Sequence, residues 1–416
     1  MPTPETAGWL PAVDPRSAEL VRLGNETRMY DAVIDEIRGR SIRIGEHWLA
    51  DFASCNYLGF DLDPEIMLAI EEQIRRWGTH PSWSRLLGNP RLYPEIEERL
   101  TALLGAPDTL LLPTVTHIHL SVVPVLAGQG TVLLEAQAHR TMYDGAVHAR
   151  ALGATVRRFR AEEPDELARL LRTAPSRYPR LVLLDGLNSM TGNVPDLPAL
   201  AGICREHGAL LYVDDAHGFG VLGERRPDET SPYGARGNAV IRYFGESYDN
   251  VVLVGGFSKA YSSLLAFLAI PTELKRHLKV AAPPYLYSGP SPIASLASVL
   301  AGFDVNEARG DALRAELHRL SARVLDQVRA LGATTPNVGH APIIELPVAP
   351  HVDLADVADT LWHAGVYVTL AAYPLVPRDQ VGFRVQLTAA HTDTEVDRLN
   401  AALRGLAEQG ALRLRS

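Results

Sequence analysis

Two apolar segments that end abruptly in polar residues constrain the fold of this chain most strongly. Residues 210–217 read LLYVDDAH, and residues 251–259 read VVLVGGFSK. A strand buried in a parallel sheet is a continuous apolar run, and its carboxyl end brings polar side chains to one edge of the sheet. We therefore predict two buried parallel strands that place Asp214, His217 and Lys259 along the same edge.

Lysine is rare in this chain, which makes the position of Lys259 informative. The sequence has 40 Lys and Arg residues, and only Lys259, Lys275 and Lys279 are lysines. Arginine stays charged, whereas a desolvated lysine can lose its proton and act as a nucleophile. Pyridoxal phosphate (PLP) requires such a lysine to hold its aldehyde as an imine, and a carboxylate to keep its pyridine nitrogen protonated. The alternative is a solvated strand end at Asp214 and Asp215, with Lys259 on the surface.

The composition indicates a globular enzyme of two domains. The chain has 416 residues, more than one average domain, and 46% of them are hydrophobic and 21% charged. The net charge of -9 argues against nonspecific nucleic-acid or anionic-membrane binding. Two cysteines, Cys55 and Cys204, cannot form a disulfide scaffold and suggest a reducing compartment. Because no signal peptide and no apolar run of about 18 residues is evident, we expect a cytoplasmic protein with no nucleic-acid partner, membrane partner or metal site.

Strand and helix patterns alternate between residues 109 and 270. Such repeated units predict a parallel sheet covered by helices on both faces. His139 follows a predicted strand and falls on the same edge as Asp214 and Lys259. The hydroxyl-rich turn at residues 113–117, between a strand and a helix, can hold a phosphate on helix amides.

The remaining segments predict a second, smaller lobe. We expect helices over residues 293–303 and 311–331, and a compact α/β unit over residues 343–406. The glycine-bounded loop at residues 78–89 is of a kind that often carries function. The predicted segments are an N-terminal arm with the start of the small domain (1–60), a large PLP-binding domain (61–305) and a C-terminal small domain (306–416).

Taken in order, the motifs of residues 51–406 resemble those of the α-oxoamine synthase family of PLP-dependent enzymes. The matching motifs are NYLG at 56–59, Ser84-Arg85, His139 in AHRTMYDG, Ser189 in NSMTGNVP, Asp214 and His217 in VDDAHGFG, Lys259 in GFSKA, the YLYSGP turn at 285–290, and Arg384 ahead of LTAAHT. Each motif is weak by itself, and their order makes them specific. The resemblance implies the α/β fold type I of PLP-dependent transferases, with a large parallel-sheet domain plus a smaller C-terminal α/β domain.

The resemblance also implies a role for each matching residue. Lys259 would hold the cofactor and move the substrate Cα proton, and Asp214 would pair with the pyridine nitrogen. His217 would hydrogen-bond the phenolic oxygen, and His139 would stack on the ring, which completes the expected catalytic set. The expected cofactor-binding residues are Thr114, Val115, Thr116, His139, Ser189, Asp214, His217, Ser258, Lys259 and Ser288. The expected substrate-binding residues are Asn56, Ser84, Arg85 and Arg384, of which Arg384 would clamp the amino-acid carboxylate.

The activity that the resemblance implies is a decarboxylating condensation of a small amino acid with an acyl thioester, giving an α-amino ketone. The thioester would be an acyl-CoA or an acyl-carrier protein. One alternative is a PLP-dependent aminotransferase or another amino-acid-transforming enzyme, and another is a non-catalytic partner of an active subunit. A homodimer is expected because the turn at residues 285–290 reaches the neighbouring subunit in the resembled family. A dinucleotide-binding dehydrogenase is disfavoured because no G-x-G-x-x-G follows a first strand.

The chain departs from the family pattern around the expected phosphate and acyl sites. Val115 stands in a turn where the family has glycine, and Gly256 stands where the family has threonine. Residues 262–267 replace a glycine-rich tail, residues 371–374 lack a common arginine, and the connection at residues 224–250 is longer than usual.

Overall fold

The computed structural model describes residues 14–415. The first 13 residues of the predicted N-terminal arm, where a signal peptide would lie, are outside this range. A seven-stranded sheet dominates the described part, in the order β4-β10-β9-β8-β7-β5-β6. Its strands are β4 (Asp108–Leu112), β5 (Thr131–Glu135), β6 (Thr155–Phe159), β7 (Arg180–Asp185), β8 (Leu210–Asp214), β9 (Val251–Gly256) and β10 (Ala266–Ile270).

Helices cover both faces of this sheet, as the alternating pattern predicted. Successive residues of a strand point to opposite faces, so Leu253 and Val254 enter different hydrophobic cores. The helices of this part are α2 (Pro64–Trp77), α3 (Leu92–Leu104), α4 (Val115–Ala127), α5 (Arg140–Ala151), α6 (Pro164–Thr173), α7 (Leu197–Glu206), α8 (Ala239–Tyr243), α9 (Thr272–Ala281) and α10 (Pro283–Leu286).

One strand of the sheet is not parallel. β10 runs antiparallel to both of its neighbours, β9 and β4, whereas β5 to β9 pair in parallel. The residues between β9 and β10, 257–265, are too few for a parallel connection, which needs a crossover of about a dozen residues or more. The sequence placed a strand here, and the short connection determines its direction.

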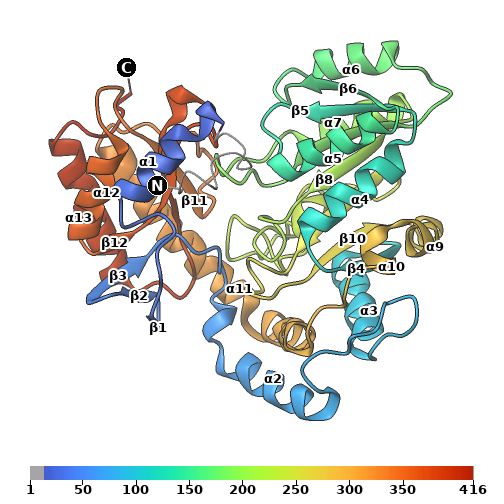
Figure 1. The fold of residues 1–416 in the computed structure, drawn as a ribbon, viewed down its shortest axis with the longest axis horizontal. Coiled ribbons are helices and arrows are strands. Elements are labelled where there is room, and N and C mark those ends of the chain that lie inside the picture. The colour runs from blue at the N-terminus through green and yellow to red at the C-terminus, as the bar shows by residue number, and fades with distance from the viewer. Residues whose placement is uncertain (1–13, 416) are drawn as a thin grey trace, which may run out of the picture.

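Two smaller sheets and three helices form the rest of the described chain. Figure 1 shows the N-terminal strands and the C-terminal helices together in one lobe, beside the large sheet. The four-stranded sheet contains β1 (Glu36–Arg38), β2 (Ser41–Ile44), β3 (His47–Asp51) and β12 (Val366–Tyr367). The three-stranded sheet contains β11 (Ile343–Pro347), β14 (Gly382–Gln386) and β13 (Thr369–Ala371). The helices are α1 (Ala18–Glu26), α12 (Leu354–His363) and α13 (Asp393–Glu408).

A single helix, α11 (Ile293–Ala330), links the two lobes over 38 residues (Figure 1). The prediction of two helices here was wrong, because no proline interrupts the segment and Gly310 is held inside the helix. A Cβ atom on Gly310 would lie 2.3 Å from Oδ1 of Asn306 and 2.8 Å from Nη2 of the buried Arg314. The helix crosses the predicted boundary between residues 305 and 306, so the division into segments stays a prediction. No helix of residues 14–415 is long and apolar enough to span a membrane.

Candidate active site

A cavity of about 300 Å³ lies at the carboxyl edge of the large sheet. It collects nine of the ten predicted cofactor-binding residues, and only Ser288 is absent from its walls. Those nine are Thr114, Val115, Thr116, His139, Ser189, Asp214, His217, Ser258 and Lys259. Thr141, Asp185, Leu187, Ala216 and Leu264 complete the lining. Strands β8 and β9 are parallel neighbours, which explains why residues 45 positions apart, Asp214 and Lys259, face one cavity.

Asp214 is the last residue of β8, and its carboxylate is buried and hydrogen-bonded. The amide of Ala216 donates to Oδ1 at 3.0 Å, and Nε2 of His119 lies 2.9 Å from Oδ2. Burial raises the pKa of Asp214, but the interaction with His119, which is hydrogen-bonded to Oδ2, and the charge of Lys259 outweigh this and lower the pKa to about 2. Asp214 is therefore an anion. Its neighbour Asp215 points away from the cavity and accepts the amides of Leu187 and Val240.

His119 is a residue that the sequence reasoning missed. It lies on the buried side of α4, and its Nδ1 is 2.9 Å from the hydroxyl of Tyr212. The available signal was a histidine among the apolar residues Ile118, Val122 and Val123, on a helix that packs against the sheet. A lone histidine of this kind is usually structural, so only its contact with Asp214 shows its connection to the site.

His217 is hydrogen-bonded to a residue of the smaller lobe. Its Nδ1 lies 2.8 Å from the hydroxyl of Tyr57, which in turn lies 3.2 Å from Oε1 of Gln386 on β14. Burial lowers the pKa of His217 far below its usual value, and the charges of Lys259 and Arg384 lower it further. His217 is therefore neutral, and its Nε2 is left for a ligand in the cavity.

His139 and Asp185 are connected at the opposite wall of the cavity. His139 is the N-cap of α5, and its Nδ1 lies 2.8 Å from the hydroxyl of Thr141. Its backbone amide donates to Oδ1 of Asp185 at 3.1 Å. Asp185 also borders a second cavity of about 600 Å³, so the two cavities adjoin at this residue.

The end of the cavity at the start of α4 has the donors that a phosphate needs. The first amides of a helix have no partner inside the helix and attract anions. Thr114 caps this helix by accepting the amide of His117 at 3.1 Å, while Val115, Thr116 and Ser258 complete the wall.

Two of the departures from the family pattern compensate for each other at this end. A Cβ atom on Gly256 would lie 3.0 Å from Cγ2 of Val115, which is tighter than an ordinary contact. The larger side chain at position 115 therefore favours the smaller residue at position 256, since any side chain there would displace Val115.

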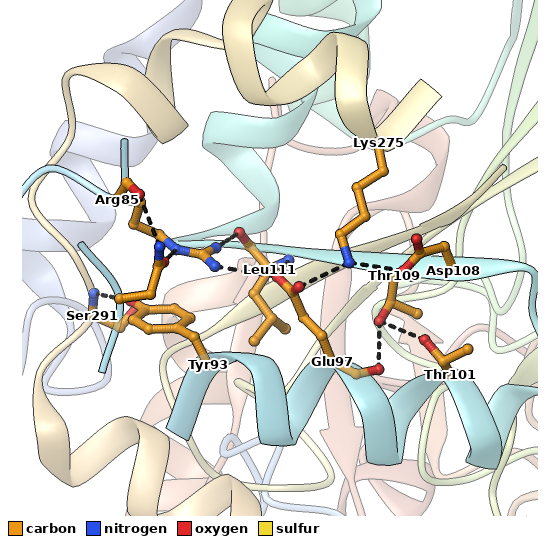
Figure 2. Close-up of polar contacts among 10 residues, drawn as sticks. Arg85, Tyr93, Glu97, Thr101, Asp108, Thr109, Leu111, Lys275 and Ser291 are labelled. Carbon is orange, nitrogen blue, oxygen red and sulfur yellow. Dashed lines mark hydrogen bonds and ion pairs between the residues drawn. The ribbon is translucent and has the colours of Figure 1, made fainter. Parts of the chain in front are cut away.

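Arg85, an expected substrate-binding residue, does not line the cavity of this single chain. Its guanidinium is buried 3.9 Å from the ring centre of Tyr93 and donates to the carbonyl of Leu111. It also donates to Oδ1 of Asn89 at 2.8 Å and pairs with Glu97 at 3.2 Å (Figure 2). These contacts give Arg85 a structural position, in which it anchors the loop at residues 78–89.

Glu97 is the centre of this ion-pair network. It accepts the amide of Leu111 at 3.1 Å and pairs with Lys275 at 2.9 Å. Lys275 in turn contacts Asp108 at 2.7 Å, so its charge is fully engaged (Figure 2). The network ties α3, β4 and α9 together. Lys259, by contrast, has no ion-pair partner among residues 14–415.

Three further predicted residues make contacts outside the cavity. The hydroxyl of Ser84 donates to the carbonyl of Leu286 at 2.7 Å, and the amide of Asn56 donates to Asp61 at 3.1 Å. Ser288 lies in the exposed turn after α10. None of the three is in the cavity lining of this single chain.

Arg384 lies on β14 in the smaller lobe and contacts the cavity wall at Ser189, but it is not among the residues that line the cavity. Its Nη1 donates to the carbonyl of Ser189 at 2.7 Å. Glu345 lies opposite Arg384 on β11, is 2% exposed, and has no hydrogen-bond partner for Oε1 among the described residues. Burial raises the pKa of Glu345 to about 7, although Arg384 opposes the shift. This buried carboxylate was not singled out from the sequence.

The donor set of the cavity fits PLP. The anionic carboxylate of Asp214 could hold a protonated ring nitrogen, and neutral His217 offers Nε2. The amine of Lys259 forms no ion pair within residues 14–415, and helix amides with hydroxyls offer an anion site. Among the described residues, no group of His, Cys, Asp and Glu is arranged to hold a metal ion.

Comparisons with known proteins agree with this geometry. The family model for aminotransferase class I and II matches residues 49–403. The 8-amino-7-oxononanoate synthase of Chromohalobacter salexigens is 36% identical over 359 residues, which cover 86% of this chain and 88% of that protein. The enzyme of the same name from Stutzerimonas stutzeri is 34% identical over 362 residues, with 86% and 88% covered.

Solved structures of serine palmitoyltransferases share the fold. The enzyme of Sphingomonas wittichii superposes with a TM-score of 0.85 at 25% identity, covering 95% of this chain and 97% of that one. A variant from S. paucimobilis, solved with a bound PLP–myriocin aldimine, gives a TM-score of 0.85 at 23% identity, with 95% and 98% covered.

Proposed function

This chain belongs to the aminotransferase class I and II family, within its α-oxoamine synthase members, and from that premise we propose that its cavity binds PLP through Lys259. The family is PLP-dependent, and the activity is the decarboxylating condensation of an amino acid with an acyl thioester. One observation carries the assignment of the site. Asp214 and Lys259 follow adjacent parallel strands and face one cavity, together with two histidines.

Each residue of the cavity has a task in this reaction. Bound PLP supplies an aldehyde that captures amines and a protonated ring that accepts the electron pair released at Cα. Asp214 keeps a proton at the ring nitrogen because its carboxylate stays ionised. The amine of Lys259 takes the Cα proton and returns one later, a role that an arginine could not fill.

The remaining residues orient the reactants. Arg384 holds the carboxylate of the amino acid with its planar pair of donors, which fixes the direction of the Cα–H bond. His217 hydrogen-bonds the phenolic oxygen through Nε2, since its Nδ1 is engaged by Tyr57. His139 covers one face of the ring and excludes water from it. The amides of Val115 and Thr116, with Ser258, hold the phosphate.

The attachment to Lys259 is tested by reduction with borohydride. The protein loaded with PLP is reduced, digested and mapped by mass spectrometry. We expect the label on the peptide that contains Lys259. Lys275 is an internal control because its amine is held by Glu97 and Asp108. A label on Lys275 or Lys279 instead of Lys259 would overturn the assignment.

The substrates we propose are a small amino acid and an acyl-CoA or acyl-carrier-protein thioester. The protein loaded with PLP is incubated with panels of both, and the products are identified by mass. An α-amino ketone that carries the acyl group, with release of carbon dioxide, supports the proposal. Conversion of the amino acid to its keto acid without a thioester, with the cofactor left as an amine, would identify an aminotransferase instead.

We propose that the working enzyme is a homodimer whose second copy completes the site. Ser288 is absent from the cavity of its own chain, and the neighbouring Tyr287 is 84% exposed. Leu87 in the loop at residues 78–89 is 82% exposed, and this loop contacts the turn through Ser84 and Leu286. Sedimentation at assay concentrations tests the proposal, and a fully active monomer would contradict it.

A further inference from the structure

Two buried side chains that do not line the cavity are hydrogen-bonded in series to Asp214. Tyr212 precedes Asp214 by two residues on β8, and His119 lies on α4, which packs against the sheet. The hydroxyl of Tyr212 is 2.9 Å from Nδ1 of His119, and Nε2 of His119 is 2.9 Å from Oδ2 of Asp214. Tyr212 and His119 are both 0% exposed, so water does not replace either contact.

The donors in this series can be assigned by counting protons. The carboxylate of Asp214 accepts the amide of Ala216 on Oδ1 and lines the same cavity as Lys259, so it is held as an anion that can only accept, and Nε2 of His119 must carry a hydrogen. If Nδ1 also carried one, the hydroxyl hydrogen of Tyr212 would need another acceptor. No such acceptor is present among residues 14–415, and an unpaired buried hydroxyl is costly. The hydroxyl of Tyr212 therefore donates to Nδ1, and His119 is neutral with its hydrogen on Nε2.

The properties of Tyr212 agree with this assignment. Burial raises the pKa of Tyr212 well above its usual value, and the charge of Asp214 raises it further, so the hydroxyl keeps its proton. The two carboxylate oxygens of Asp214 then have different donors, the amide of Ala216 on Oδ1 and His119 on Oδ2. These two hydrogen bonds fix the plane of the carboxylate.

We propose that Tyr212 and His119 are positioning residues that hold the Asp214 carboxylate ionised and in one orientation, with the hydroxyl of Tyr212 keeping Nδ1 of His119 unprotonated. This rests on the proposed binding of PLP, whose ring nitrogen would stay protonated beside the Asp214 carboxylate. A hydrogen bond from a neutral imidazole stabilises the carboxylate without adding a second positive charge beside the ring. Without this donor, Asp214 becomes a stronger base and competes with the ring nitrogen for the shared proton.

Four variants separate this role from simple packing. His119→Leu removes the donor to Asp214, while His119→Gln keeps an N–H donor near the position of Nε2. Tyr212→Phe removes only the hydroxyl and should fold even if the leucine variant does not. His117→Gln is the matched control, because His117 lies on the same helix and is exposed.

The first measurement uses the protein without cofactor, labelled with ¹⁵N in histidine. Nitrogen NMR at pH 7 should show His119 neutral with its hydrogen on Nε2 in the wild type. In Tyr212→Phe, no hydroxyl donates to Nδ1, so Nδ1 can take a proton and the doubly protonated His119 should become detectable. An unchanged spectrum in Tyr212→Phe would overturn the role of Tyr212, and a protonated His119 in the wild type would overturn the assignment.

The second measurement uses protein loaded with PLP labelled with ¹⁵N in the ring. We expect the ring nitrogen to be protonated in the wild type, His117→Gln and His119→Gln. In His119→Leu its shift should move toward that of neutral pyridine, and the dissociation constant for PLP should rise about tenfold or more. A fully protonated ring with unchanged PLP affinity in His119→Leu would refute the proposal. If the wild type does not bind PLP, the proposed function fails instead, and the cofactor-free spectra still test the hydrogen-bond assignment.

Discussion

Replacing Gly256 by threonine should disrupt the phosphate end of the cavity, because Val115 already occupies the space. The new Cβ atom would lie 3.0 Å from Cγ2 of Val115, whereas carbon atoms pack best at about 3.5–4.0 Å. Val115 is the first residue of α4 and is β-branched, so its side chain cannot readily rotate away. Overpacking of this kind costs about 1–3 kcal/mol. For a domain of about 150–250 residues, each kcal/mol lowers the Tm by about 2–4 °C.

The pair is tested by a double-mutant cycle. Val115→Gly should by itself cost about 1 kcal/mol through lost helix propensity and packing. In the double variant the threonine fits, so the two destabilisations should partly cancel, with a coupling of about 1–3 kcal/mol. The threonine also brings its side chain toward Ser258, whose Oγ would lie 3.5 Å from the new Cβ atom, so PLP affinity should recover.

Thermal unfolding and PLP titration of the four proteins decide the outcome. Gly202→Thr is the matched control, since a Cβ atom at Gly202 meets nothing within 4 Å. It should leave both quantities unchanged or slightly improved. Strictly additive losses in the double variant would refute the steric reasoning, as would a Gly256→Thr protein with normal stability and normal PLP affinity.

Substitutions at three other residues test the remaining polar side chains. Arg384→Ala should weaken amino-acid binding about ten- to a hundredfold, because a hydrogen bond worth about 1.5–3 kcal/mol is lost, while PLP loading stays unchanged. Spectral titration checks both quantities. Arg384→Lys should recover only part of the amino-acid affinity. Arg85→Ala should lower the free energy of unfolding by about 3–5 kcal/mol because it breaks a buried ion pair with Glu97. If the variant were instead stable and bound the amino acid more weakly, Arg85 would be a substrate-binding residue. Glu345 has a folded-state pKa raised to about 7, so it binds its proton more tightly when folded, and its contribution to stability is lost as pH rises from about 4 to 7. Glu345→Gln should remove up to roughly 3 kcal/mol of this pH-dependent loss of unfolding free energy. If the Tm values of the two proteins changed equally between pH 4 and 8, the prediction would be contradicted.

The sequence predicted the elements whose signal is local. The apolar runs before Asp214 and Lys259 gave β8 and β9 and the edge on which both side chains lie. The direction of β10 followed from the length of a connection, a weaker signal than the composition of the strand itself. The continuity of α11 depended on the packing of Gly310 against Asn306 and Arg314, which no periodicity reveals.

Some predicted site residues lie outside the cavity, and other residues near the site were not predicted. In both cases the position depends on contacts between distant segments. A loop arginine looks the same in the sequence whether it faces a substrate or, as Arg85 does, a buried carboxylate 12 residues away. The relevance of His119 to the site is shown only by its contact with Asp214, 95 residues away in the sequence. The relevance of Glu345 is shown only by its position opposite Arg384, 39 residues away. Motif order therefore located the cavity, and the structure located the side chains that support it.

A hydrogen-bonded series from Gln386 through Tyr57 to His217 joins the smaller lobe to the cavity. Gln386 follows Arg384 by two residues on β14, and its side chain contacts Tyr57, the partner of His217, and donates to the carbonyl of Ala53 at 2.6 Å. Closing motions need hinge residues that absorb large changes in backbone torsion, and α11 passes between the lobes as unbroken helix. A rigid-body rotation of the lobe would pull on His217 as it moved Arg384. The smaller lobe is therefore joined to the proposed cofactor site through Tyr57, so the proposed contact of Arg384 with the substrate carboxylate and that of His217 with the cofactor would change together.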